Sequence, residues 1–114
     1  MYDEAIATLL KIEGSNPLKT ASLGYAYAMS GRPAEARTML KELDQLSLHQ
    51  HVPAISRAKI YIGLNDKDNA FKSLHQALDE RAWEFGTLKV NYIFDPLRSD
   101  PRFTDLLSRV GLAR

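Results

Sequence analysis

Two histidines, His49 and His51, form the one short-range pattern in this sequence that could bind a metal ion. Only one residue separates them, and two imidazoles at such a spacing can bind the same zinc ion. The sequence has no cysteine, no second histidine pair and no cluster of carboxylates that would complete the site. We therefore interpret both histidines as solvent-exposed loop residues and predict no metal site.

Asp95 and Asp100 are spaced like a pair of carboxylates that could act as general acid and base. Each of them directly precedes a proline, an arrangement typical of a helix N-cap followed by proline at the first helical position. We therefore predict that they are helix caps. His75 has no nucleophile or base at a suitable spacing, and the six glycines are too scattered for a nucleotide-binding loop. The sequence predicts neither an enzyme nor a cofactor.

Charge and composition restrict the class of partner. Fifteen basic and fourteen acidic residues leave a formal net charge of +1, which is not the strongly basic surface that nucleic acids or anionic membranes require. No apolar run approaches the length of a membrane-spanning helix. The absence of cysteine is compatible with a reducing compartment, so a cytoplasmic location is expected. Neither nucleic acid nor membrane is an expected partner.

The elements that would position any site repeat along the chain. Small, aromatic and turn residues recur at a constant offset of 34, as 58 − 24 and 65 − 31 illustrate. The matching pairs are Gly24 and Ala58, Tyr27 and Tyr61, Gly31 and Asn65, Ala36 and Ala70, and Leu40 and Leu74. This period is typical of repeated helical hairpins.

Apolar periodicity predicts a series of helices with no strand. They are expected at residues 3–13, 16–30, 33–47, 53–64 and 66–80, with a short helix within 82–91 and a last one from 101 to about 110. Gly31 and Asn65 should adopt the left-handed conformation in the tight turns. Gly24 should mark a close crossing of helices, and Gly24→Ala should stabilise its helix if the space allows.

The two ends of the chain carry separate expectations. Apolar residues near the C-terminus should cover the exposed face of helix 66–80 as a cap. They are Phe94, Leu97, Phe103, Leu106 and Val110. The first helix should leave Ile6 and Leu10 exposed, and this face could support a weak homodimer.

These spacings resemble those of tetratricopeptide repeat (TPR) proteins. The first repeat matches the family pattern at Leu23, Gly24, Tyr27, Gly31, Ala36 and Leu40, and the second at Ala58, Tyr61, Asn65, Ala70, Leu74 and Ala77. Arg57 stands where leucine is usual, and Thr20 and Ala54 stand where tryptophan is usual. The resemblance implies an all-α, right-handed α-α superhelix. It would comprise a half-repeat helix at 3–13, repeats at 17–47 and 52–80, and a C-terminal cap at 81–114.

A narrower resemblance covers residues 51–112. The run Phe94–Phe103, with its two Asp-Pro units, is similar to the C-terminal end of TPR regions in bacterial multidomain signalling proteins. In such proteins the repeats follow kinase, winged-helix or cyclase domains. The resemblance implies that the chain is the C-terminal part of a larger bacterial protein, whose upstream part would carry any catalysis or DNA binding.

TPR proteins bind other proteins, so the resemblance implies a concave groove for a peptide or a partner domain. The groove positions chosen as the site are Tyr25, Met29, Ile55, Lys59 and Ile62. The lysine and asparagine with which some TPRs bind a C-terminal carboxylate are absent, since Ala21 and Tyr25 occupy those positions. Helical repeats that bind RNA have a similar period but need basic grooves. The remaining alternative is a structural end-piece that self-associates or packs on an upstream domain.

Overall fold

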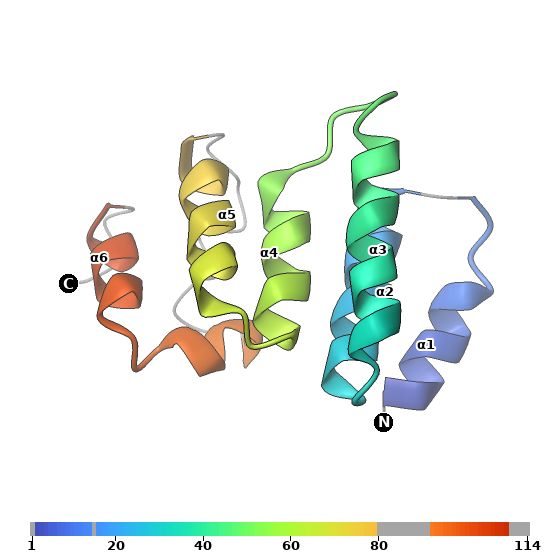
Figure 1. Ribbon diagram of the computed structural model, residues 1–114, viewed down its shortest axis with the longest axis horizontal. Helices are drawn as coiled ribbons and strands as arrows, with labels where there is room; N and C mark the ends of the chain where they lie inside the picture. Colours follow the sequence, from blue (N-terminus) through green and yellow to red (C-terminus); the bar gives the residue numbers. More distant parts are fainter. Residues whose placement is uncertain (1, 15, 80–91, 110–114) are drawn as a thin grey trace.

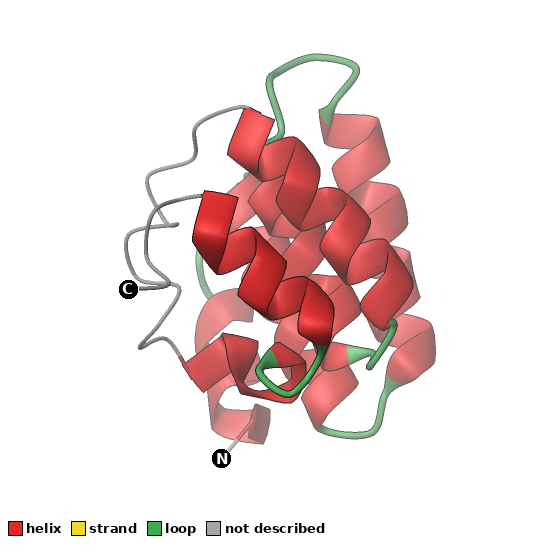
Figure 2. Cartoon of the chain, turned by 90° about the vertical axis from the view of Figure 1, so that its left-hand side faces the viewer, coloured by secondary structure: helices red, strands yellow, loops and turns green. Residues whose placement is uncertain are grey.

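The computed structural model describes residues 2–14, 16–79 and 92–109, and within them it contains helices and no strand (Figure 2). The elements are α1 (Tyr2–Leu10), α2 (Pro17–Met29), α3 (Pro33–Leu46), α4 (Ala54–Gly63), α5 (Lys67–Asp79), the 3₁₀-helix η2 (Tyr92–Leu97) and α6 (Pro101–Arg109). The prediction of an all-α chain is confirmed for these residues, and each α-helix bound lies within three residues of its predicted position. The short helix predicted within 82–91 lies outside the described residues.

The helices form a compact domain of pairs. α2 packs against α3 and α4 against α5, while α2 and α4 join the two pairs. α1 packs on α2 at one end of the row and α6 on α5 at the other, as Figure 1 shows. η2 crosses the bottom of that view and contacts α4. The described chain measures 41 × 31 × 21 Å.

Both pairs turn in the same way. Gly31 has φ of 80° and Asn65, 34 residues later, has φ of 59°, so the predicted left-handed turns are confirmed. The backbone N–H of the next residue reaches back over each turn. Arg32 N donates to Tyr27 O at 2.8 Å, and Asp66 N donates to the matching carbonyl of the second pair at 2.9 Å. These bonds satisfy carbonyls that a helix C-terminus otherwise leaves without a partner.

Side-chain caps begin three of the helices. Asn16 and Asp66 each accept a hydrogen bond from the backbone N–H three residues later, at 2.9 and 3.3 Å. Asp100 accepts one from the N–H two residues later at 2.9 Å, as the predicted cap of α6. The matching prediction for Asp95 is wrong. Asp95 lies inside η2 and accepts a hydrogen bond from Arg98 Nε at 2.7 Å, because the chain enters a 3₁₀ turn before its proline.

Close backbone approach joins α2 to α4. A methyl group placed on Gly24 would lie 2.5 Å from Ile60 Cγ1 and 3.1 Å from Met39 Cβ. A methyl group on Gly63 would lie 2.9 Å from Ala28 Cβ. The prediction of a tight crossing at Gly24 is therefore confirmed, and a second glycine on α4 extends the crossing along the two helices.

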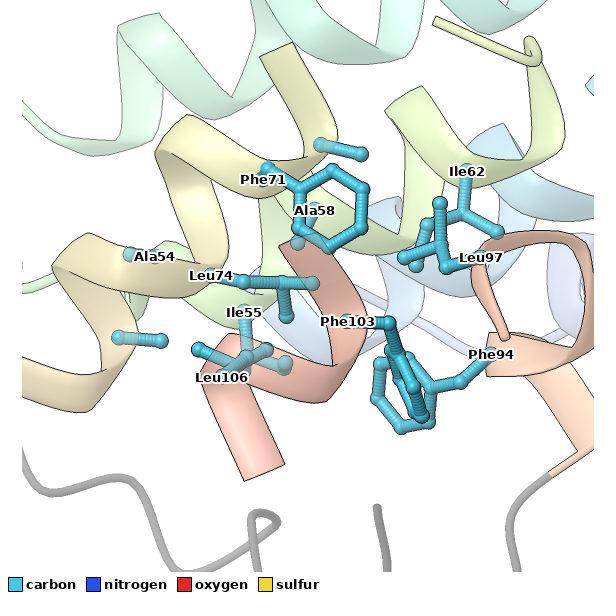
Figure 3. Close-up of a cluster of buried hydrophobic side chains, with 12 residues drawn as sticks. Ala54, Ile55, Ala58, Ile62, Phe71, Leu74, Phe94, Leu97, Phe103 and Leu106 are labelled. Carbon is cyan, nitrogen blue, oxygen red and sulfur yellow. The ribbon is translucent and has the colours of Figure 1, made fainter. Parts of the chain in front are cut away.

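The C-terminal elements complete the core around α4 and α5. Figure 3 shows Phe94 and Leu97 of η2, and Phe103 and Leu106 of α6, together with side chains of α4 and α5. All four are at most 2% exposed. Their predicted role as a cover is confirmed, although η2 covers α4 as well as the predicted helix. The fifth predicted member, Val110, lies outside the described residues.

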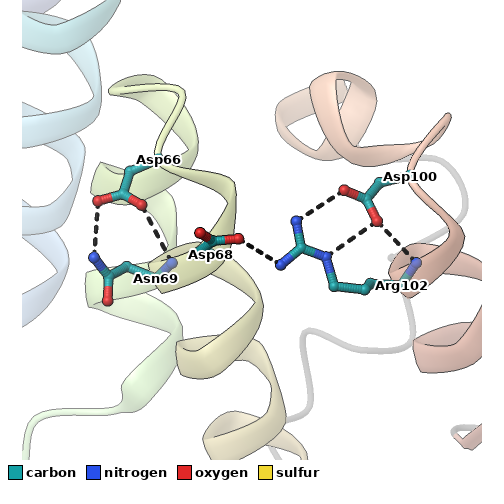
Figure 4. Close-up of polar contacts among 5 residues, drawn as sticks. All are labelled: Asp66, Asp68, Asn69, Asp100 and Arg102. Carbon is teal, nitrogen blue, oxygen red and sulfur yellow. Dashed lines mark hydrogen bonds and ion pairs between the residues drawn. The ribbon is translucent and has the colours of Figure 1, made fainter.

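An ionic cluster holds the start of α6 to the start of α5 (Figure 4). Arg102 Nη1 donates to Asp68 Oδ1 at 2.8 Å, and Nη2 donates to Asp100 Oδ2 at 2.9 Å. The same guanidinium lies 4.6 Å from the centroid of the Phe71 ring, a favourable cation–π distance. The side-chain and backbone hydrogen bonds from Arg102 hold the pKa of Asp100 below its usual value, and this pairing raises the pKa of Arg102.

Gly24→Ala should destabilise the protein, because the space on which the expected stabilisation depended is absent. Alanine has the better helix propensity by about 1 kcal/mol, but the new methyl group would overlap the fully buried Ile60. Overpacking of this kind costs about 1–3 kcal/mol, so the melting temperature should fall by several degrees. Gln45→Ala, at an exposed position of α3, is the control and should be nearly neutral. An unchanged or raised melting temperature for Gly24→Ala would contradict the tight crossing.

The Asp100 pairing should add stability that disappears in acid. Because the pKa of Asp100 is lower in the folded chain than its ordinary value of 3.8, the unfolded chain binds the proton more readily. This contribution is complete above the unfolded pKa and is lost as the pH falls through the lower pKa of the folded chain. In urea unfolding at a series of pH values, wild type should exceed Asp100→Asn in stability at neutral pH and lose that advantage in acid. A difference that stays constant with pH would contradict the pairing.

Candidate functional site

The structure divides the five predicted groove residues into two groups. Ile55 and Ile62 of α4 are buried in the core cluster with Phe94 and Leu97 (Figure 3). η2 thus lies over the part of α4 where the groove was expected, and these two isoleucines are packing residues of the described structure.

Two of the other three predicted residues lie at a surface pocket. Tyr25 and Lys59, which stand 34 positions apart in the sequence, both line it. Met29 is 41% exposed, one helical turn beyond Tyr25 on the same face of α2.

Three helices form this pocket. α1 supplies Tyr2, Ala5 and Leu9, and α2 supplies Ser22, Tyr25 and Ala26, with Lys59 reaching in from α4. The ring centroids of Tyr2 and Tyr25 lie 6.4 Å apart at 72°, an edge-to-face contact that joins α1 to α2. The lining side chains are therefore mostly apolar or aromatic, and they also carry the hydroxyl groups of Tyr2, Ser22 and Tyr25 and the ammonium group of Lys59.

The volume of the pocket limits what it can contain. It is about 200 Å³, whereas pockets for small-molecule ligands and cofactors usually measure about 300–1,000 Å³. This space suits one or two protein side chains better than a cofactor.

The face of α2 that borders the pocket extends beyond it. Leu18, Ser22, Tyr25 and Met29 follow one another at intervals of four, three and four residues, so they share one side of the helix. Leu18 is 65% exposed. At 1.5 Å per residue the face from Leu18 to Met29 is about 16 Å long, which is about three turns of a helical ligand.

Local contacts fix α1 beside α2 and so shape the pocket. Lys19 Nζ donates to the carbonyl oxygens of Ile12 and Gly14 at 2.7 and 2.9 Å, across the connection between the two helices. At the other end of α1, Asp3 accepts a hydrogen bond from Arg32 at 3.1 Å. Ile6 is 5% exposed and packs on α2, so the expectation that it would be open is wrong. Leu10, at 58%, is exposed as expected.

No histidine of the described chain lines this pocket. His49 and His51 are exposed between α3 and α4, and His75 is partly buried on α5. Among the described residues no group of three or more histidine or acidic side chains could hold a metal ion. Within the same residues, no helix has the length and apolar character needed to cross a bilayer.

Tyr2, Ala5, Leu9 and Ser22 were missing from the predicted site. The spacing of the first three, at intervals of three and four residues, places them on one face of α1. That pattern could have identified a second wall, but the sequence does not show which side of α2 this face would meet. Comparison with known proteins finds no family model, curated protein or solved structure that matches the chain.

Proposed function

We propose that this chain is a protein–protein interaction module, without catalysis of its own, that binds a peptide or a partner domain at the pocket between α1, α2 and α4. One observation carries the proposal. Ser22 and Tyr25, which line the pocket, share one face of α2 with Leu18 and Met29, and the latter two are exposed. An apolar pocket with exposed anchors beside it is the arrangement that protein partners use.

The proposal includes the finer fold and family. We propose a right-handed superhelix of TPR type, from the C-terminal part of a larger bacterial protein, acting in the cytoplasm. Support comes from the equivalence of the two helical pairs. Gly31 and Asn65 have the same turn conformation, and Ala36 and Ala70 are both fully buried, at the same offset of 34 residues.

A second candidate function is self-association, as a structural end-piece. It is favoured by the exposure of Leu10 on α1 and of Ile12 just beyond it. Sedimentation at increasing concentration distinguishes the two functions. A dimer that dissociates on Leu10→Glu, with the helical content unchanged, would favour self-association, and a monomer would favour partner binding.

Peptide selection tests the binding proposal directly. Peptides of random sequence displayed on phage would be selected on the immobilised chain, and their dissociation constants measured by fluorescence anisotropy. Leu18→Glu and Met29→Glu should each weaken the selected peptides by about tenfold or more, because a charge would then stand on the contact face. Leu48→Glu is the matched control, since Leu48 is an equally exposed leucine beyond α3 and away from the pocket.

The melting temperatures of the three variants should stay near that of the parent, since all three positions are exposed. Peptides that tolerate both pocket variants, or that lose affinity equally in Leu48→Glu, would contradict the proposed site.

A further inference from the structure

The packing of α2 on α4 shows what kind of element fits against these helices. Gly24 of α2 leaves room for the side chain of Ile60, and Ala28 of α2 meets the bare backbone of Gly63. At the first point a large residue faces a glycine, and at the second a glycine faces an alanine. The surface of α4 that faces α2 therefore has a large side chain at Ile60 and none three residues later, at Gly63.

α2 has an equivalent wall of its own. Subtracting 34 from 60 and 63 gives Ala26 and Met29, so α2 carries a small residue where α4 has Ile60 and a large one where α4 has Gly63. Ala26 lines the pocket and Met29 is exposed beside it. On α4, this surface is the one against which α2 packs. On α2, the matching surface borders the pocket.

A comparison of two equivalent residues supports this correspondence. Val52, just before α4, is 7% exposed and belongs to a cluster that includes Ala28 of α2. Leu18, 34 residues earlier, is 65% exposed. Within the described part of the chain, the face of α2 therefore lacks the cover that the matching face of α4 receives.

We infer that the pocket is a seat for an amphipathic helix of a partner protein, packed on α1 and α2 as α2 packs on α4. This inference rests on the proposed function and specifies the chemistry of its ligand. Helix-in-groove recognition uses apolar anchors three and four residues apart, and the three-turn face of α2 has the length for it.

The side-chain sizes of Ala26 and Met29, compared with those of Ile60 and Gly63, determine which partner helix would fit. Since Ala26 replaces Ile60, the pocket has room for a large apolar side chain at the position that matches Gly24. Since Met29 replaces Gly63, the position four residues later, which matches Ala28, must be small. The partner helix thus carries a large residue at one position and a small one a turn later, whereas α2, which fits α4, is small at both positions.

The chain itself provides the probe. A synthetic peptide with the sequence of residues 16–31 reproduces α2, and a covalent staple between the positions of Leu18 and Ser22 would hold it helical on the side away from the contact face. Two versions would be compared by anisotropy against the full chain, the native sequence and Gly24→Leu. A third version, Gly24→Leu with Ala28→Leu, tests the small position.

The Gly24→Leu peptide should bind at least about tenfold more tightly than the native sequence, because its added side chain enters the pocket. The doubly substituted peptide should bind poorly to the parent chain, and its affinity should recover on the Met29→Ala chain. This variant should fold normally because Met29 is exposed. Met29→Glu should abolish binding of all versions, and Leu48→Glu should leave it unchanged.

Other outcomes would overturn the inference. Equal or tighter binding of the native peptide, or no recovery on Met29→Ala, would show that the size rule is wrong. If selected peptides require Leu18 and Met29 while no stapled helix binds, the proposed function stands and the ligand is extended. If neither binds, both fail. A dimer of the chain that dissociates on Met29→Glu would identify a second copy as the occupant in place of a partner helix.

Discussion

The close crossing of α2 and α4 is the constraint on which the rest of the structure depends. Gly24 admits Ile60, and Gly63 admits Ala28, so the two helices approach to a distance that larger residues would prevent. Each helix also holds its own partner through a left-handed turn. The crossing therefore fixes the two helical pairs relative to each other, and with them the faces of α2 and α4 that other elements can cover.

The outcome differs on the two helices. On α4, η2 covers Ile55 and Ile62 with Phe94 and Leu97, and α6 is held to α5 by the Arg102 cluster. α1 packs on α2 and buries Ile6 there. It leaves a pocket that Tyr25 of α2 helps to line. The face of α4 that matches the pocket face of α2 is not the one that η2 covers. It carries Val52 and Ile60, which are buried in a cluster with Ala28 of α2.

Local features of this fold could be predicted from the sequence because they depend on single residues. The left-handed turns at Gly31 and Asn65 and the caps at Asn16 and Asp100 follow from side-chain chemistry within a few positions. The crossing at Gly24 was predictable because glycine inside a helix is costly without a packing reason.

Long-range placement could not be predicted in the same way. Periodicity identified Ile55 and Ile62 as one face of a helix, but not that η2 would lie on it. Ile6 was expected to be open because its apolar stripe had no visible partner, whereas the structure turns it onto α2. The contact of Tyr2 with Tyr25 likewise depends on how α1 is oriented, which the connection held by Lys19 determines.

The central claim is that the face of α2 is open while the matching face of α4 is covered. Paramagnetic relaxation of methyl groups by a soluble gadolinium chelate measures this directly. The methyl groups of Leu18 and Met29 should relax strongly, near the level of the exposed Ile12, and those of Val52, which matches Leu18, should be protected, in agreement with their exposures. Equal relaxation of Leu18 and Val52, or protection of Met29 in the isolated chain, would contradict the account.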